Sequence, residues 1–173
     1  MSEREPIAEQ MPTPNNPELT STITPWAQIR DILVEGGHTW LMTVRPDGRP
    51  HVVPVGALWV DGAYIVTTGQ GTVKGNNLDH DSHCVISLSS PGFDVVVEGE
   101  AAKVSDVGKL ERIARVYADQ GWPAYVHDGV LDAPFSAATT GPAPYDVYEI
   151  APSVAFAFGT GEETISRSTR YRF

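Results

Sequence analysis

The sequence contains a single cysteine, Cys84, so an internal disulfide is excluded. Its setting, HCVISL, is typical of a buried strand rather than of an activated thiolate. Basic residues are also few, because 12 Lys and Arg stand against 22 Asp and Glu, which gives a formal net charge of -10. Nucleic acids and anionic membranes are bound through basic surfaces, so we expect neither as a partner.

Long apolar runs are absent as well. No stretch approaches the roughly 20 apolar residues that cross a bilayer, and the N-terminal segment lacks the apolar core of a secretory signal. We therefore expect a cytoplasmic protein. Residues 1–21 are polar and proline-rich, which predicts a disordered N-terminal arm, whereas residues 22–173 are long enough for one domain with its own core.

Two segments carry apolar side chains at helical spacing. Thr24 as N-cap and Pro25 in the first turn precede the first helix, which Gly36-Gly37 ends. Asp106 is the N-cap of the second helix, and Gly121 stops it. The buried faces are predicted to consist of Trp26, Ile29, Ile32 and Leu33 in the first helix, and of Val107, Leu110, Ile113, Ala114 and Tyr117 in the second.

The remaining patterned segments predict β-strands. The predicted strands cover residues 39–44, 51–60, 63–68, 83–90, 94–104, 145–150 and 154–159, the last two being separate strands or one strand broken at Pro152. Pro54 and Gly56 indicate an edge or a bulge, where backbone groups are free to meet a ligand. About six antiparallel strands joined mostly by short turns close most simply into a small barrel, because a β-sandwich offers no clear place for the helices.

Two stretches are left outside this barrel. Residues 123–144 are rich in Pro, Gly, Ala and Thr and are too long for an ordinary connection, so we expect a lid or an arm that spans two subunits. The terminal segment ISRSTRYRF contains three arginines. It is either a solvated end or an anion-contacting tail anchored by Tyr171 and Phe173.

The segment TTGQGTVKGNNL, residues 67–78, is the most informative one for function. A strand that ends in hydroxyl side chains enters a turn with two glycines and then a helix whose first turn contains Lys74. Helix N-termini carry unpaired N–H groups and a partial positive charge, so an anion such as a phosphate is favoured there. Common turns share this spacing, and the segment lacks the GxxxxGK[ST] pattern of a P-loop.

The segments TVRPDGRPHVVPV, TTGQGTVKGNNL, DVVVEGEA, YDVYEI and STRYRF, in this order, resemble the pyridoxamine 5'-phosphate oxidase-like superfamily of flavin and deazaflavin oxidoreductases, of actinobacterial type. The resemblance covers nearly everything from Trp26 to Phe173. It implies a mainly β fold, the six-stranded antiparallel split barrel with peripheral helices. It also implies a homodimer with two cofactor sites at its interface, each binding coenzyme F-420 or FMN.

The resemblance also assigns cofactor-binding residues. The phosphate would be held by Thr67, Thr68, Thr72 and Lys74, and the backbone of Val53, Pro54 and Val55 would lie along the ring system. Gly69 and Asn77 are the further cofactor-binding residues. This chain departs from the family's RxKxRNL pattern, because Thr72 and Asn76 stand where arginines are usual. An arginine fork binds phosphate more strongly than a neutral amide does. We hypothesise that Arg170 compensates for the missing charges.

Hydride transfer requires little from side chains beyond positioning, exclusion of water and at most one proton donor. Donor candidates are His51, Tyr125, His127 and Asp128, and no catalytic residue is assigned. His80 and His83 lack a third ligand nearby, so a metal is not expected.

The preferred hypothesis is a reductase that uses reduced coenzyme F-420 to deliver hydride to an activated double bond of a small organic molecule. The alternatives are an FMN-dependent oxidoreductase of the pyridoxamine 5'-phosphate oxidase type, or a non-catalytic flavin- or haem-binding protein. Oxidation of pyridoxamine 5'-phosphate itself is disfavoured, since STRYRF only partly matches the expected arginine cluster.

Overall fold

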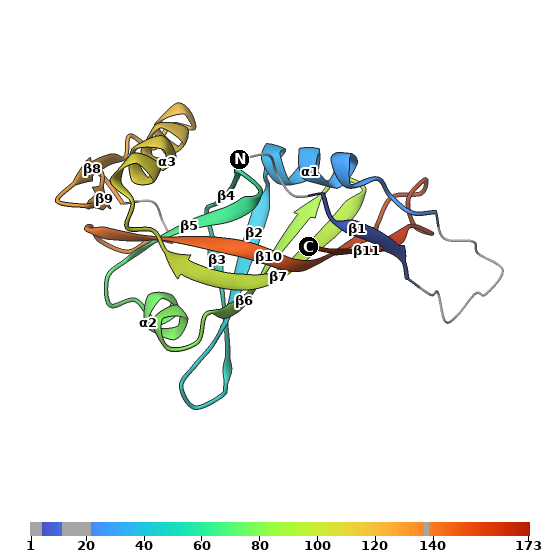
Figure 1. Cartoon of the computed structure of the whole chain (residues 1–173), viewed down its shortest axis with the longest axis horizontal. Helices are drawn as coiled ribbons and strands as arrows, with labels where there is room; N and C mark the ends of the chain where they lie inside the picture. Colours follow the sequence, from blue (N-terminus) through green and yellow to red (C-terminus); the bar gives the residue numbers. More distant parts are fainter. Residues whose placement is uncertain (1–4, 12–21, 137–138) are drawn as a thin grey trace.

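The computed structural model describes residues 5–11, 22–136 and 139–173. Within these ranges the strands form one antiparallel sheet with three helices packed around it (Figure 1). No described helix has the length and apolar character that crossing a membrane requires. The elements in chain order are β1 (Ile7–Gln10), α1 (Trp26–Glu35), β2 (His38–Val44), β3 (Pro50–Val55), β4 (Ala57–Val60), β5 (Ala63–Gly69), α2 (Val73–His80), β6 (His83–Ser90), β7 (Phe93–Lys103), α3 (Val107–Asp119), β8 (Tyr125–His127), β9 (Val130–Asp132), β10 (Tyr145–Gly159) and β11 (Ser168–Arg172).

The strands wrap into the predicted split barrel. Neighbouring strands pair in the order β3-β2-β6-β7-β10-β5-β4, and β3 continues into β4 across Gly56, so the path returns to its starting point. No ladder joins β3 to β4 or β5 in the part of the chain that is described, so hydrogen bonds do not close the barrel. The single strand predicted for residues 51–60 is therefore two strands, because the backbone changes its pairing partner at Gly56.

The strand predicted in two pieces or broken at Pro152 is one strand of 15 residues, β10. Its register against β7 shifts between Pro152 and Val154, which indicates a β-bulge. The bulge lies at Pro152 because proline has no N–H to donate to the neighbouring strand. Gly99 of β7 pairs with Pro152, and a Cβ at Gly99 would overlap the carbonyl oxygen of Ala151. Glycine at this position allows the two strands to approach closely.

Both predicted amphipathic helices are present and cover the core. Trp26, Ile29 and Leu33 of α1 are buried in the cluster that fills the barrel. The apolar face of α3 is buried in a second cluster, except for Val107 in its first turn, which was predicted to be buried but is 50% exposed. Asp106 caps α3, because its carboxylate accepts a hydrogen bond of 2.7 Å from the N–H of Lys109.

The predicted cap of α1 by Thr24 is wrong. The N-cap position is occupied by Pro25, which makes no side-chain cap hydrogen bond. Thr24 is fully buried instead, and it connects the helix to β11: its N–H donates to Oγ1 of Thr169 at 2.9 Å, and its carbonyl accepts from the Tyr171 hydroxyl at 2.7 Å.

The two ends of the described chain pair with each other. The terminal segment forms β11, and Tyr171 is fully buried with its ring 5.1 Å from that of Trp26. The predicted disorder of residues 1–21 is wrong for Ile7–Gln10, because these residues pair with β11 as strand β1. Residues 1–4 and 12–21 of that predicted arm lie outside the described residues.

The long segment before β10 is partly regular. It contains the hairpin of β8 and β9, which lies beside α3 at one end of the molecule (Figure 1). Residues 139–144, which we call the strap, then lead back to the start of β10. The segment therefore packs on its own chain over its described length, and a role in spanning two subunits stays a prediction.

Candidate functional site

The turn between β5 and α2 brings hydroxyl groups to the start of a helix. Thr72 is the N-cap of α2, and its Oγ1 accepts a hydrogen bond of 3.3 Å from the N–H of Gly75. The same Oγ1 lies 2.6 Å from Oγ1 of Thr68, which is buried at the end of β5. Because a helix N-terminus has a partial positive charge, this arrangement favours an anion.

Lys74 is buried in the first turn of α2, with only 6% of its surface exposed. Its Nζ donates a hydrogen bond of 2.7 Å to the carbonyl oxygen of Thr139 in the strap. Burial lowers the pKa of the ammonium group. One carbonyl engages only one of the three N–H donors, so two remain for another ligand.

These groups form what we call the cradle: the side chains of Thr68, Thr72 and Lys74 with the backbone N–H of Gly69. An ammonium, two hydroxyls and a helix N-terminus are the donor types that bind phosphate, so the residues fit a phosphorylated cofactor. The strap lies against the cradle, since the Gly69 N–H donates to the carbonyl of Thr140 and the Gln70 N–H donates to that of Pro144.

A polar network on the other side of α2 fixes the cradle to the barrel. The hydroxyl of Tyr148 on β10 donates to Asp79 of α2 at 2.7 Å. Lys103 of β7 lies between two carboxylates, with Nζ 3.5 Å from Asp79 and 3.0 Å from Asp146. Burial, together with the bond to Asp79, raises the pKa of Tyr148, so its hydroxyl stays protonated and able to donate.

Asn77 was predicted to contact the cofactor, but here it anchors α2 to β2. Its side chain is buried and Nδ2 donates to Oγ1 of Thr43 at 2.8 Å. The same hydroxyl lies 3.5 Å from Nδ1 of His51. Burial, with Arg45 and Lys74 nearby, lowers the pKa of His51 and favours its neutral form.

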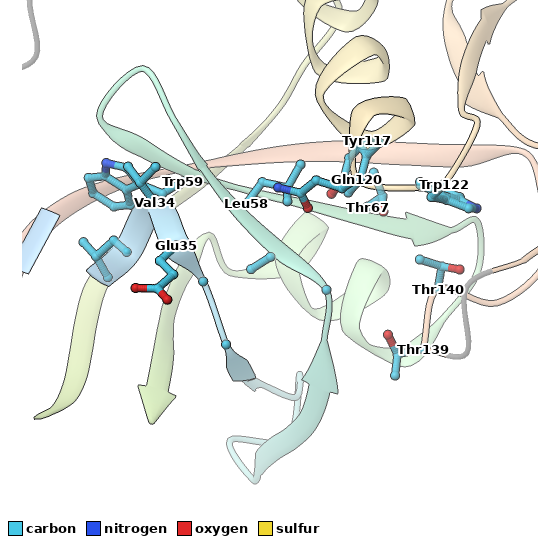
Figure 2. Close-up of a pocket in the computed structure, with 15 residues that line it drawn as sticks. Val34, Glu35, Leu58, Trp59, Thr67, Tyr117, Gln120, Trp122, Thr139 and Thr140 are labelled. Carbon is cyan, nitrogen blue, oxygen red and sulfur yellow. The ribbon is translucent and has the colours of Figure 1, made fainter. Parts of the chain in front are cut away.

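A cavity of about 300 Å³ opens next to the cradle, and Thr139 and Thr140 of the strap form part of its wall (Figure 2). Its walls come from the end of α1, from β4 and β5, from the end of α3 and from the strap. Thr67 lines it, whereas Thr68, the next residue of β5, bonds to Thr72 in the cradle. Thr139 contacts both sites, because it lines the cavity and its backbone carbonyl accepts a hydrogen bond from Lys74 of the cradle.

A second, adjoining hollow of about 250 Å³ lies along β3. Pro54, Val55 and Gly56 line it, and it shares Gly56 and Thr139 with the large cavity. A Cβ at Gly56 would meet no atom within 4 Å, so this residue borders open space where the two hollows meet. The break between β3 and β4 therefore exposes backbone to this space, and its contact with a ligand stays a prediction.

The structure thus brings together most of the residues predicted to bind a cofactor. Thr67, Thr68, Gly69, Thr72 and Lys74 lie at the end of β5 and the start of α2, next to the hollow of Pro54 and Val55. Val53 lines neither hollow in the described structure and packs against the barrel core instead.

Arg170 is not at this site within one chain. It pairs with Phe156 of β10, whereas Thr68 pairs with Asp146, and ten strand residues correspond to about 30 Å. Its Nε donates to Glu9 of β1 at 2.9 Å. Any contact between Arg170 and the cradle therefore requires a second copy of the chain.

None of the four predicted proton-donor candidates lines the large cavity or the adjoining hollow. Tyr125, His127 and Asp128 lie on the β8–β9 hairpin. His51 lies in the network of Asn77 and Thr43, near enough to Lys74 for that charge to affect its pKa.

The cavity has lining residues that the sequence did not single out as site residues. Figure 2 shows Tyr117, Gln120 and Trp122, from the end of α3 and just beyond it, close to Thr67. Tyr117 was predicted as a core residue, which is correct, but its hydroxyl faces Thr67 and makes no hydrogen bond of acceptable geometry with a described residue. Trp122, which stands just before the long loop, is the one of these three residues whose aromatic side chain could be expected from the sequence to line a substrate pocket.

Comparisons with known proteins agree with this architecture. A family model described as pyridoxamine 5'-phosphate oxidase matches residues 26–157. No curated protein matches the chain. Three similar solved structures illustrate the likeness, which at these identities concerns the fold.

The conserved hypothetical protein Rv2991 of Mycobacterium tuberculosis is 19% identical, with 81% of this chain and 88% of that chain covered at a TM-score of 0.60. An F420 reductase is 21% identical, with coverage of 73% and 94% and a TM-score of 0.53. General Stress Protein 26 of Bacillus anthracis is 15% identical, with coverage of 76% and 92% and a TM-score of 0.55.

Proposed function

Because the chain belongs to the pyridoxamine 5'-phosphate oxidase family, we propose that it is an oxidoreductase that binds a phosphorylated flavin-type cofactor, with reduced coenzyme F-420 as the preferred one. The observation that carries this proposal is the burial of Lys74 at the N-terminus of α2, directly beside a cavity of about 300 Å³. A bound cofactor of this type supplies the hydride that reduces the substrate.

The chain's own residues then have distinct tasks. The cradle binds the phosphate through Lys74, Thr68 and Thr72. The hollow at Pro54 and Val55 holds the ring system against the backbone near Gly56, which pairs with no neighbouring strand. The aromatic walls of the cavity exclude water from the acceptor. The likeness to an F420 reductase supports deazaflavin over FMN, which is the alternative cofactor.

The first test is the cofactor that purified protein takes up. Under the proposal, the protein binds F-420 tightly and, with reduced F-420, reduces a small enone such as cyclohexenone. A yellow preparation that retains FMN and turns over with it supports the FMN alternative. Tight binding of either cofactor without turnover of any acceptor supports a non-catalytic binding protein.

The charge of the cavity indicates the class of acceptor. Among the 15 residues that line it, none is Lys, Arg or His, and the only carboxylate is that of Glu35 at the end of α1. Phosphates and carboxylates are bound by cationic side chains, so this lining disfavours an anionic acceptor. The proposed substrate is an uncharged molecule with a planar, conjugated double bond.

We predict that a neutral enone is reduced with a higher kcat/KM than an analogue that carries a carboxylate. A like charge about 4 Å from Glu35 costs about 1 kcal/mol in water, which corresponds to roughly fivefold. Glu35→Gln is expected to reduce the ratio of the two kcat/KM values, neutral enone over carboxylate analogue, about fivefold. Glu111→Gln, on α3 outside the cavity, is expected to leave this ratio unchanged. An equal preference in the parent protein would contradict the assignment of the acceptor to this cavity.

A homodimer is part of the proposal because an apolar stripe crosses the outer face of the barrel. Directly paired residues on neighbouring strands place Pro54, Trp40, Ser87, Val96 and Phe156 in one row. Trp40 is 47% exposed, and Val52 in the adjacent row is 51% exposed. Family members are often dimers, and exposed apolar surface of this kind marks an interaction site.

A dimer built on this stripe gives Arg170 a role. Arg170 follows Phe156 at one end of the row, and Pro54, which lines the hollow, is at the other end. In a two-fold contact the same surface meets itself in reverse, so each end of the row lies near the opposite end on the other copy. The partner's Arg170 would then approach the cofactor hollow.

Replacing Trp40 with Asp is expected to dissociate this dimer at micromolar concentration, because a buried unpaired carboxylate is strongly unfavourable at an interface. Sedimentation velocity provides the measurement, since Trp40 also lines the hollow and a change in cofactor affinity would not report on the dimer alone. Ile165→Asp is the matched control, since Ile165 is 71% exposed but lies outside the stripe. A Trp40→Asp protein that remains dimeric would show that the interface, if any, lies elsewhere.

A further inference from the structure

The strap supplies carbonyl oxygens that accept hydrogen bonds from the N–H donors of the cradle. The Thr139 carbonyl accepts from Lys74 at 2.7 Å, and the Thr140 carbonyl accepts from the Gly69 N–H. A third strap carbonyl, that of Pro144, accepts from the Gln70 N–H at 3.4 Å. Each donor that faces the strap is therefore bonded to an oxygen of the same chain.

These contacts conflict with a phosphate in the cradle. Carbonyl oxygens carry partial negative charge, and two of them are directed at donors that an anion would use. A phosphate oxygen can accept from one of the two remaining N–H donors of Lys74, but it then lies close to the carbonyl oxygen of Thr139, and the two oxygens repel each other. In the absence of an anion, however, a buried ammonium needs an acceptor, and the strap provides one.

We propose that the strap is an internal ligand of the cradle, which the phosphate of the cofactor displaces when it binds. This inference rests on the proposed function and specifies how the site is regulated. Thr139 and Thr140 also line the large cavity, so displacement of the strap changes the cavity wall at the same time. The cofactor therefore binds first, and its phosphate prepares the cavity for the acceptor.

Gly69 sets how closely the strap approaches. A Cβ at this position would overlap the Pro142 carbonyl oxygen and would lie 3.0 Å from the Thr140 oxygen and 3.3 Å from the Gly141 carbon. These are backbone atoms that cannot rotate away, so Gly69→Ala forces the strap off the cradle. Alanine itself suits the extended backbone of β5, where Gly69 pairs with Tyr145.

The direct test is the exchange rate of the Gln70 amide proton in the parent protein, measured by NMR, because Gln70 bonds to the strap but does not belong to the cradle. Addition of FMN or F-420 is expected to accelerate this exchange at least about tenfold, because the bond to Pro144 is lost. Riboflavin, which has the same ring but no phosphate, is expected to leave the rate unchanged. Slower or unchanged exchange with bound FMN and F-420 would overturn the inference while the cofactor assignment stands.

The second measurement is cofactor affinity in Gly69→Ala. If the strap leaves the cradle in about a tenth of the parent molecules, the apparent affinity of the parent is about tenfold lower than that of a protein whose strap is always displaced. We therefore expect Gly69→Ala to bind FMN and F-420 about tenfold more tightly than the parent. Gly108→Ala on α3 is the control, because a Cβ there makes only ordinary contact, 3.5 Å from Asp106. Binding to Gly69→Ala but not to the parent supports the inference. Weaker binding overturns it, and no binding to either protein overturns the cofactor proposal together with it.

Discussion

Replacement of Lys74 by Met is expected to weaken binding of F-420 and FMN by about 10- to 100-fold. A hydrogen bond to a charged group contributes about 1.5–3 kcal/mol, and 1.4 kcal/mol corresponds to a factor of ten. Lys74 is the cradle's only cationic side chain, so no other group in the cradle replaces its charge. Methionine preserves the buried aliphatic stem, which separates the loss of charge from a loss of packing. Fluorescence titration of the cofactor measures the effect.

Lys109→Met is the matched control for this experiment. Lys109 lies on α3, where it forms an ion pair of 2.6 Å with Glu149, and it lines neither cavity nor hollow. We expect its replacement to leave both affinities unchanged. If Lys74→Met and Lys109→Met behave alike, the cradle does not bind the phosphate.

Replacement of Gly56 by Leu is expected to reduce kcat/KM at least about 100-fold with little change in stability. The side chain would extend into the junction of the cavity and the hollow, where a Cβ meets no atom within 4 Å. Displacing reactants by about 1 Å already costs roughly 100-fold in rate. Since the residue makes no buried contact, the melting temperature should shift by less than about 3 °C.

Two further variants make this result specific. Gly56→Ala adds only one methyl group to the same space and is expected to give an intermediate loss. Gly108→Leu introduces the same side chain on α3 and should leave kcat/KM unchanged. A fully active Gly56→Leu protein would place the reaction outside the two hollows.

The sequence predicted the features of the fold that depend on neighbouring residues. The apolar spacing in α1 and α3 and the glycine-containing turn that leads into the helix of Lys74 are local patterns, and the structure shows each of them. The resemblance to the family added the barrel, which no local pattern specifies uniquely. The cradle was predictable for the same reason, because its side chains come from one short segment.

Contacts between distant segments could not be predicted in this way. Lys74 binds the carbonyl of a residue 65 positions later, and a backbone carbonyl has no residue type that marks it. The pairing of Glu9 with Arg170 joins the two ends of the described chain. The sequence around Glu9 does not reveal its distant partner, and its polar composition alone predicted disorder. Tyr117 fits the helical apolar pattern, which conceals its place beside Thr67 in the cavity wall.

The most direct test of the central claim compares FMN with riboflavin on the parent protein and on Lys74→Met. The two ligands share the ring and differ in the phosphate, so their affinity ratio isolates the contribution of the cradle. We predict that the parent binds FMN at least about tenfold more tightly than riboflavin and that Lys74→Met reduces this ratio to near one. Equal affinities in the parent, or a ratio that the substitution leaves unchanged, would contradict phosphate binding at Lys74.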